Sequence, residues 1–159
     1  VCTDELGDNY KEADKLRHML SEAVQLDADA YTGIIAARRL PKETEALQQA
    51  RSTAIYEATI RAAEIPLQVA QHALQVMRLA VRIAEIGNLN ALSDAGAAVN
   101  LANAALKGAA LNVRINCLGI ETEPQPAVLL SKLAAIESEA PNLLVNMNLT
   151  LKERSGLQN

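Results

Sequence analysis

Gly87-Asn88-Leu89-Asn90-Ala91-Leu92-Ser93-Asp94 separates two long segments with helical apolar periodicity. Glycine directly after a helix and serine directly before one are the usual residues at helix ends. The stretch therefore predicts a helix that ends at the glycine, a short polar loop, and a second helix that begins directly after the serine. This corner carries three polar candidates for a functional site, Asn88, Asn90 and Asp94.

Polar and small side chains follow one face of that second helix, because they recur at steps of three, four or seven residues. They are Asp94, Ala98, Ala105, Ala109, Asn112 and Asn116. One interpretation is a groove that receives a planar ligand and orients it through the acid and the two amides. The other, which the scarcity of pockets in proteins favours, is a close helix–helix contact with asparagines hydrogen-bonding across it.

The composition restricts the fold class. Half of the 159 residues are hydrophobic but only 2% are aromatic, so the core must be built from alanine, leucine, isoleucine and valine. Such a composition favours helices, and the β-branched and aromatic runs that mark strands are absent. We therefore predict a single all-α domain over residues 1–159, an antiparallel helical bundle of long, partly kinked helices.

Several function classes are disfavoured by charge and motif content. The net charge is −4 with dispersed charges and no basic patch, which argues against nucleic acid as a partner. No apolar run reaches the ~18 residues of a membrane span, and no signal-peptide pattern is visible. Two cysteines, no metal-ligand spacing and no glycine-rich phosphate loop predict a cytoplasmic, reduced protein without a metal site.

The first helix is expected from about Asp8 to Leu40. Its apolar stripe consists of Leu16, Leu20, Ala23, Asp27, Ala30, Ile34 and Ala37. Asp27 places a carboxylate on this stripe, where it must be paired, hydrogen-bonded or protonated. It is either a general acid–base or cation-stabilising group, or a structural cap or ion-pair partner. Asp29 falls on a more polar side of the same helix.

A basic corner follows, where Pro41 stops the first helix. Arg38, Arg39 and Lys42 form either a basic turn that suits the helix dipole or a clamp for a carboxylate-bearing ligand. Thr44 is expected to cap the next helix, which Pro66 then kinks or restarts. A last helix is expected over 127–153 with an interruption at Pro141 and a frayed tail after it.

Five stretches together resemble the cyclodeaminase domain of formimidoyltransferase-cyclodeaminase and the stand-alone bacterial proteins of that family. They are residues 27–31 (DADAY), 39–42 (RLPK), 65–67 (IPL), 87–94 (GN with SD), and 108–116 (GAALNVRIN). The resemblance covers roughly Leu20 to Ile120. Each stretch alone has little specificity, but five in register are specific.

The resemblance implies a helical subunit that forms a homodimer, binds reduced folate among its helices and needs no further cofactor. It implies conversion of 5-formiminotetrahydrofolate to 5,10-methenyltetrahydrofolate and ammonia, towards which we lean, or hydrolysis of the methenyl compound to 10-formyltetrahydrofolate. Asp94 is then the first candidate catalytic carboxylate and Asp27 the second. The residues expected to bind substrate are Asn88, Asn90, Asn112, Asn116, Asp29, Arg38, Arg39 and Lys42.

One departure from the family pattern stands out. Members usually begin with a further helix preceded by a Gly-Gly-Gly-Ser segment, and this chain begins at Val1 without it. We therefore expect a domain that lacks its N-terminal helix. Two readings from other classes remain open, a non-catalytic helical interaction module and a structural dimer whose alanine-lined face is its own subunit interface.

Overall fold

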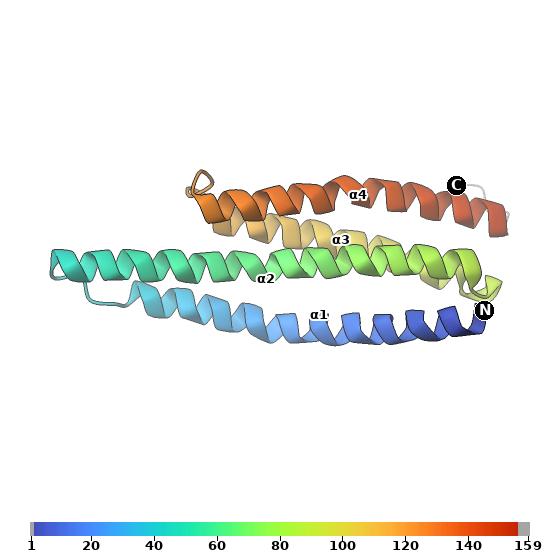
Figure 1. Cartoon of the computed structure of the whole chain (residues 1–159), viewed down its shortest axis with the longest axis horizontal. Coiled ribbons are helices and arrows are strands. Elements are labelled where there is room, and N and C mark those ends of the chain that lie inside the picture. The colour runs from blue at the N-terminus through green and yellow to red at the C-terminus, as the bar shows by residue number, and fades with distance from the viewer. Residues whose placement is uncertain (1, 156–159) are drawn as a thin grey trace.

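A computed structural model describes residues 2–155, with side chains from residue 5 onward, as an antiparallel bundle of long helices (Figure 1). The helices are α1 (Cys2–Arg38), α2 (Glu45–Ile86), α3 (Leu92–Cys117) and α4 (Pro124–Ser155), with a 3₁₀ turn η1 (Leu89–Ala91) before α3. No strand occurs in this part of the chain. The all-α prediction is confirmed. Of the tail predicted at 155–159, Ser155 belongs to α4, and residues 156–159 lie outside the described residues, as does the Cys2 side chain.

Helix α2 is the centre of the bundle. It packs against α1, α3 and α4, and the first turns of α2, together with the end of α1, project beyond the other two helices (Figure 1). The core between these helices is aliphatic, with Ala63, Met77, Val99 and Val113 fully enclosed. No polar or charged side chain among the described residues is fully buried. The stability of the bundle therefore comes from apolar burial between α2 and its neighbours.

Neither proline ends its helix, so a new start at Pro66 and an interruption at Pro141 are both excluded. Helix α2 continues through Pro66, and α4 continues through Pro141. Pro66 is buried, and the carbonyl of Ala62, which it leaves without a helical donor, accepts from Nδ2 of Asn116 at 2.8 Å. Pro141 is exposed, so water can reach the carbonyl it leaves free. Tertiary packing and solvation thus compensate what each proline removes from its own helix.

The predicted helix ends are partly right. The hydroxyl of Thr44 accepts from the backbone N–H of Leu47 and caps α2, as expected. Gly87 is the C-cap of α2, also as expected. Helix α3 begins at Leu92 and not, as expected, after Ser93. The 3₁₀ turn η1, which Asn88 caps, leads directly into the helix.

Ion pairs join α4 to α2 and to α3. Arg78 of α2 binds Glu139 of α4 through two nitrogens, at 2.5 and 2.6 Å, and Arg114 of α3 binds Glu137 of α4 at 2.6 Å. The guanidinium of Arg78 holds the pKa of Glu139 below its usual range. These pairs are largely solvent-exposed and add specificity to the packing more than stability.

Within residues 2–155, none of the helices carries an apolar stretch of the length that crossing a bilayer requires.

Candidate functional site

The predicted site residues lie toward opposite ends of the bundle. Asn88, Asn90 and Asp94 lie where α2 passes through η1 into α3, beside the first turns of α1 (Figure 1). Asn116 lies near the other end of α3. At 1.5 Å per residue, the 22 residues from Asp94 to Asn116 span about 33 Å of helix. The structure therefore does not bring the two groups together in one site of one chain.

The corner at Asn88 serves the backbone. Oδ1 of Asn88 accepts from the backbone N–H of Asn90 at 2.9 Å and thereby caps η1. Asp94 is exposed in the first turn of α3, where a carboxylate suits the positive end of the helix dipole. These local roles account for Asn88 and Asp94 without a ligand, so the corner alone gives little support for a binding site.

The polar face of α3 does not form the groove of the first interpretation. Asp94, Ala105 and Asn112 are exposed, whereas Ala109 is buried. The face therefore runs along the boundary between the α2 contact and solvent. Its one interhelical hydrogen bond, from Asn116 to the Ala62 carbonyl, matches the helix–helix interpretation at that position.

Asp27 and Asp29 of α1 are both exposed, which corrects the prediction that Asp27 lies on a buried stripe. The buried positions of α1 are Leu16, Ala23 and Ala37, spaced by multiples of seven. This narrow seam meets little besides α2, and Asp27 lies outside it. Asp29 accepts from Nε2 of Gln25 at 2.8 Å on the solvent side of the helix.

The basic corner at residues 38–42 is held by backbone contacts, and its charged side chains are exposed. The backbone carbonyl of Arg38 accepts two hydrogen bonds from the guanidinium of Arg51, at 3.1 and 3.0 Å, which locks the end of α1 onto α2. Lys42 is held through its backbone, by Glu43 and Gln48. The side chains of Arg39 and Lys42 are exposed and line neither of the two hollows described below.

A hollow of about 530 Å³ joins α1, α2 and the end of α3, and we call it the Arg38–Asn116 hollow. It is lined by Ile34, Arg38, Ser52, Ile55, Tyr56, Thr59, Ile115, Asn116, Leu118 and Ile120. Two residues that the sequence marked separately, one on α1 and one on α3, therefore share a single concave surface. No carboxylate is among its lining residues.

The two marked residues lie at opposite ends of this hollow. The Arg38 carbonyl is bonded to Arg51, and Asn116 is bonded to Ala62, eleven residues further along α2. Eleven helical residues correspond to about 16 Å. Asp27 lies eleven residues from Arg38 on α1, in the same direction because α1 and α2 are antiparallel, and on the same face of α1. Asp27 and Asn116 are therefore level with each other.

Sequence reasoning missed the floor of the hollow. Ser52, Ile55, Tyr56 and Thr59 follow one another at helical spacing and form a single face of α2. Tyr56 is half-buried against the core and offers an aromatic surface. The spacing was visible in the sequence, as was the end of α3 near Leu118, but the sequence did not show which face of α2 this helix end leaves open.

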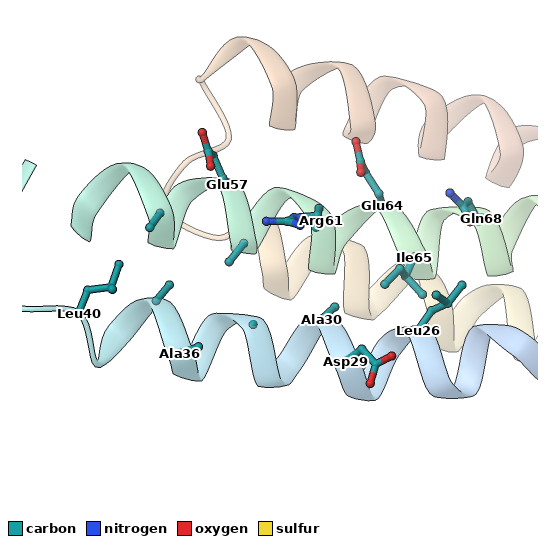
Figure 2. A pocket seen from close by; sticks show the side chains of 14 residues that line it. Leu26, Asp29, Ala30, Ala36, Leu40, Glu57, Arg61, Glu64, Ile65 and Gln68 are labelled. Carbon is teal, nitrogen blue, oxygen red and sulfur yellow. The ribbon is translucent and has the colours of Figure 1, made fainter. Parts of the chain in front are cut away.

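A larger hollow of about 670 Å³ lies on another side of the same two helices, and we call it the Arg61 groove. Figure 2 shows Leu26 and Ile65 meeting between α1 and α2, with Asp29, Glu57 and Glu64 toward its edges. Alanine and glycine supply most of the floor. This groove holds Asp29 but none of the other predicted site residues.

Charge distinguishes the two hollows. The Arg61 groove has three carboxylates and one guanidinium on its walls, which disfavours an anionic ligand. The Arg38–Asn116 hollow has a guanidinium and no carboxylate among its lining residues, which favours one. Although it is smaller, we take the Arg38–Asn116 hollow as the candidate site for a ligand that carries negative charge.

The family model described as formiminotransferase-cyclodeaminase matches residues 2–135, most of the chain. The chain belongs to the formiminotransferase-cyclodeaminase family. This member is 35% identical to a methenyltetrahydrofolate cyclohydrolase of Methylorubrum extorquens over 91% of its own length and 69% of that relative. It is 33% identical to the rat formimidoyltransferase-cyclodeaminase over 61% of its own length, which is only 18% of the rat protein.

The fold of this family member also matches a crystal structure. The formiminotetrahydrofolate cyclodeaminase of Thermotoga maritima superposes with a TM-score of 0.75 over 88% of this chain and 66% of that one. Sequence identity in that comparison is 22%, so the likeness concerns the fold alone. The family-model match and the cyclohydrolase relative confirm the resemblance to the family that was predicted from five short stretches.

Four of those five stretches lie on the segments that flank the two hollows in this family member. Residues 27–31 and 39–42 lie on α1 and the turn after it, residues 65–67 on α2, and residues 108–116 on α3. The fifth stretch, 87–94, lies at the far end of the bundle. The distribution places four of the five stretches in the half of the bundle that holds the two hollows.

Proposed function

We propose that this chain acts on the one-carbon unit between N5 and N10 of tetrahydrofolate, within the Arg38–Asn116 hollow. The observation that carries the proposal is that Arg38 and Asn116, about 16 Å apart along the helices, line one hollow that has no carboxylate among its lining residues. A folate has the matching shape, with a glutamate carboxylate tail at one end and a ring edge bearing hydrogen-bonding groups at the other.

Each part of the hollow has a role in binding. Arg38 meets the carboxylates of the tail through charge-assisted hydrogen bonds. Tyr56 and the aliphatic side chains beside it cover the apolar middle of the ligand. Asn116 hydrogen-bonds the edge of the pterin ring, and Asn112, one turn earlier on α3 and exposed, can reach the same edge from outside.

A carboxylate near the reacting carbon serves both candidate reactions. In the hydrolysis, water adds to the methenyl carbon, the resulting tetrahedral carbon loses its bond to N5, and 10-formyltetrahydrofolate forms. In the deamination, N10 attacks the formimino carbon and ammonia leaves. Both start from an amidinium-like cation, which a carboxylate stabilises, and both need proton transfer at nitrogen or oxygen.

Asp27 is the carboxylate best placed for this role. It lies on the same face of α1 as Arg38 and level with Asn116, whereas Asp94 is about 33 Å from Asn116 along α3. In a single chain, Asp94 is therefore too distant to assist a ligand held in this hollow. The order of the two candidates that the sequence suggested is reversed in the proposal.

Two reactions remain candidates, each supported by an observation. The match that covers 91% of this chain is to a cyclohydrolase, which supports hydrolysis of the methenyl compound. The family model and the superposed crystal structure carry the cyclodeaminase name, which supports deamination. Both reactions change the near-ultraviolet absorbance of 5,10-methenyltetrahydrofolate, so one assay separates them.

The assay offers the protein 5-formiminotetrahydrofolate and then 5,10-methenyltetrahydrofolate and follows that absorbance band. Growth of the band in the first case identifies the deaminase, and decay faster than in buffer in the second identifies the hydrolase. Asp27→Asn should abolish most of the turnover and retain binding, while Asp94→Asn serves as the matched control with unchanged turnover. No turnover and no folate binding by the unmodified protein would favour a helical interaction module instead.

We also propose that the protein is a homodimer, that it acts in the cytoplasm, and that it needs no further cofactor. Large apolar side chains of α3, namely Leu101, Leu111 and Ile115, are 60–72% exposed on one side of the helix, and such patches mark association surfaces. Leu101→Glu should shift the molecular mass measured by light scattering toward the monomer. Leu149→Glu, at an exposed leucine of α4, is the control, and an unchanged mass for both would remove α3 from the interface.

A further inference from the structure

The carbonyl of Ala62 lacks the donor that an α-helix normally provides. In a helix, the carbonyl of one residue accepts from the N–H four residues later, and that position is Pro66, which has no N–H. Ala62 is buried, so its carbonyl needs a partner within the protein. Asn116, which belongs to another helix 54 positions away, supplies that partner at 2.8 Å.

This contact fixes the orientation of the Asn116 amide. A carbonyl oxygen only accepts hydrogen bonds, so the amide must turn its NH₂ group toward Ala62. The two arms of a planar amide diverge, and Oδ1 therefore points away from α2. Oδ1 makes no hydrogen bond with any residue in the described part of the chain, and Asn116 lines the Arg38–Asn116 hollow.

Building on the proposed function, we infer that Asn116 presents Oδ1 to the hollow as a fixed acceptor for an N–H donor on the pterin ring edge. Pro66 is the positioning residue, because it frees the Ala62 carbonyl that holds the amide in this orientation. A free asparagine accepts and donates with equal ease after a flip. Here the proline in α2 removes that freedom and makes the hollow selective for a donor at this point.

The test separates stability from binding. We would compare the unmodified chain, Asn116→Ala, and the double variant Asn116→Ala with Pro66→Ala, measuring urea unfolding and the titration of 5-formyltetrahydrofolate by calorimetry. Asn116→Ala should unfold at lower urea and bind five- to tenfold more weakly, which corresponds to one hydrogen bond. In the double variant the N–H of residue 66 can donate to Ala62, so stability should recover while the weak binding remains.

Recovery of both stability and affinity in the double variant would overturn the inference, because Asn116 would then act only on the fold. Affinity within twofold of the unmodified chain for Asn116→Ala would overturn it as well. Pro141→Ala is the matched control, since it removes the other proline inside a helix at an exposed position of α4. Failure of the unmodified chain to bind reduced folate is a separate outcome that removes the proposed function together with this inference.

Discussion

Arg154, near the end of α4, donates from Nη2 to the carbonyl oxygen of Gly87 at 3.0 Å. Its second terminal nitrogen donates to the carbonyl of Ala84. These are among the last carbonyls of α2, which have no partner within their own helix. The Arg154 side chain therefore caps the C-terminal end of α2 and joins it to the last turn of α4.

Replacing Arg154 by methionine should destabilise the protein. The change keeps an apolar stem of similar length but removes both hydrogen bonds, each from a charged donor, and we expect a loss of about 2 kcal/mol in the free energy of unfolding. Urea denaturation measured by circular dichroism gives this value. Lys152→Met is the control, since Lys152 is an exposed cation two residues away, and equal losses for both variants would contradict the capping role.

Gly87→Ala should be costly for a steric reason. A Cβ at this position would lie 2.6 Å from the backbone oxygen of Ile83, which the Gly87 N–H already approaches to 2.8 Å. The backbone must then move, and we expect the free energy of unfolding to fall by about 1–3 kcal/mol.

Gly108→Ala is the counterpart within α3, where no atom lies within 4 Å of the added Cβ. Alanine should stabilise that helix by about 0.5–1 kcal/mol. Opposite changes in the urea midpoint of the two alanine variants would separate a steric requirement from a general preference for glycine. A stabilising Gly87→Ala would show that the end of α2 can adjust freely.

The fold could be predicted because helix periodicity is a property of neighbouring residues. The apolar periodicity of alanine and leucine and the cap at Thr44 both depend on local spacing. The expected helices and the cap are both found in the structure. The helix through Pro66 could not be predicted, because the residue that compensates it, Asn116, lies on another helix. Rules for proline in a single helix do not include such a partner.

The candidate site was predictable in its parts and not in its assembly. Arg38 and Asn116 were marked by residue type and spacing, and the structure brings them to one hollow. Asp27 was expected to be buried because its spacing fits a wide apolar stripe, but α1 meets little besides α2 and its seam is narrow. The width of a buried face depends on the number of neighbouring helices, which periodicity does not give.

Acidification should destabilise the bundle through His72. Burial, and secondly the positive charge of Lys15, hold the pKa of His72 below its ordinary value of 6.5, and its Nδ1 is buried without a hydrogen-bond partner in the described part of the chain. Because the unfolded chain binds this proton more readily, stability is lost as the pH falls through 6.5 toward the lowered pKa of the folded state.

His72→Gln should therefore reduce the difference in unfolding free energy between pH 7.5 and pH 5.5. Urea denaturation at both values checks this expectation. His18→Gln is the control, since His18 is exposed on α1 and bonded to its neighbours there. An unchanged difference in His72→Gln would mean that other groups carry the pH dependence.

Arg38→Ala should weaken substrate binding and spare the chemical step. In the proposed site the guanidinium meets the tail carboxylates and does not contact the reacting carbon, so it contributes equally to the bound substrate and to the transition state. We expect KM to rise about tenfold or more with kcat nearly constant, the pattern of uniform binding. The backbone carbonyl that accepts from Arg51 is retained, so the end of α1 should keep its place.

Arg39→Ala is the matched control for Arg38→Ala. It removes the same charge one residue away, at a side chain that lines neither hollow, and KM should change less than twofold. Because both variants alter the net charge equally, a difference between them reports contact with the ligand and not long-range attraction. If both raised KM alike, the basic corner would act through its overall field, and the tail would bind elsewhere than in the Arg38–Asn116 hollow.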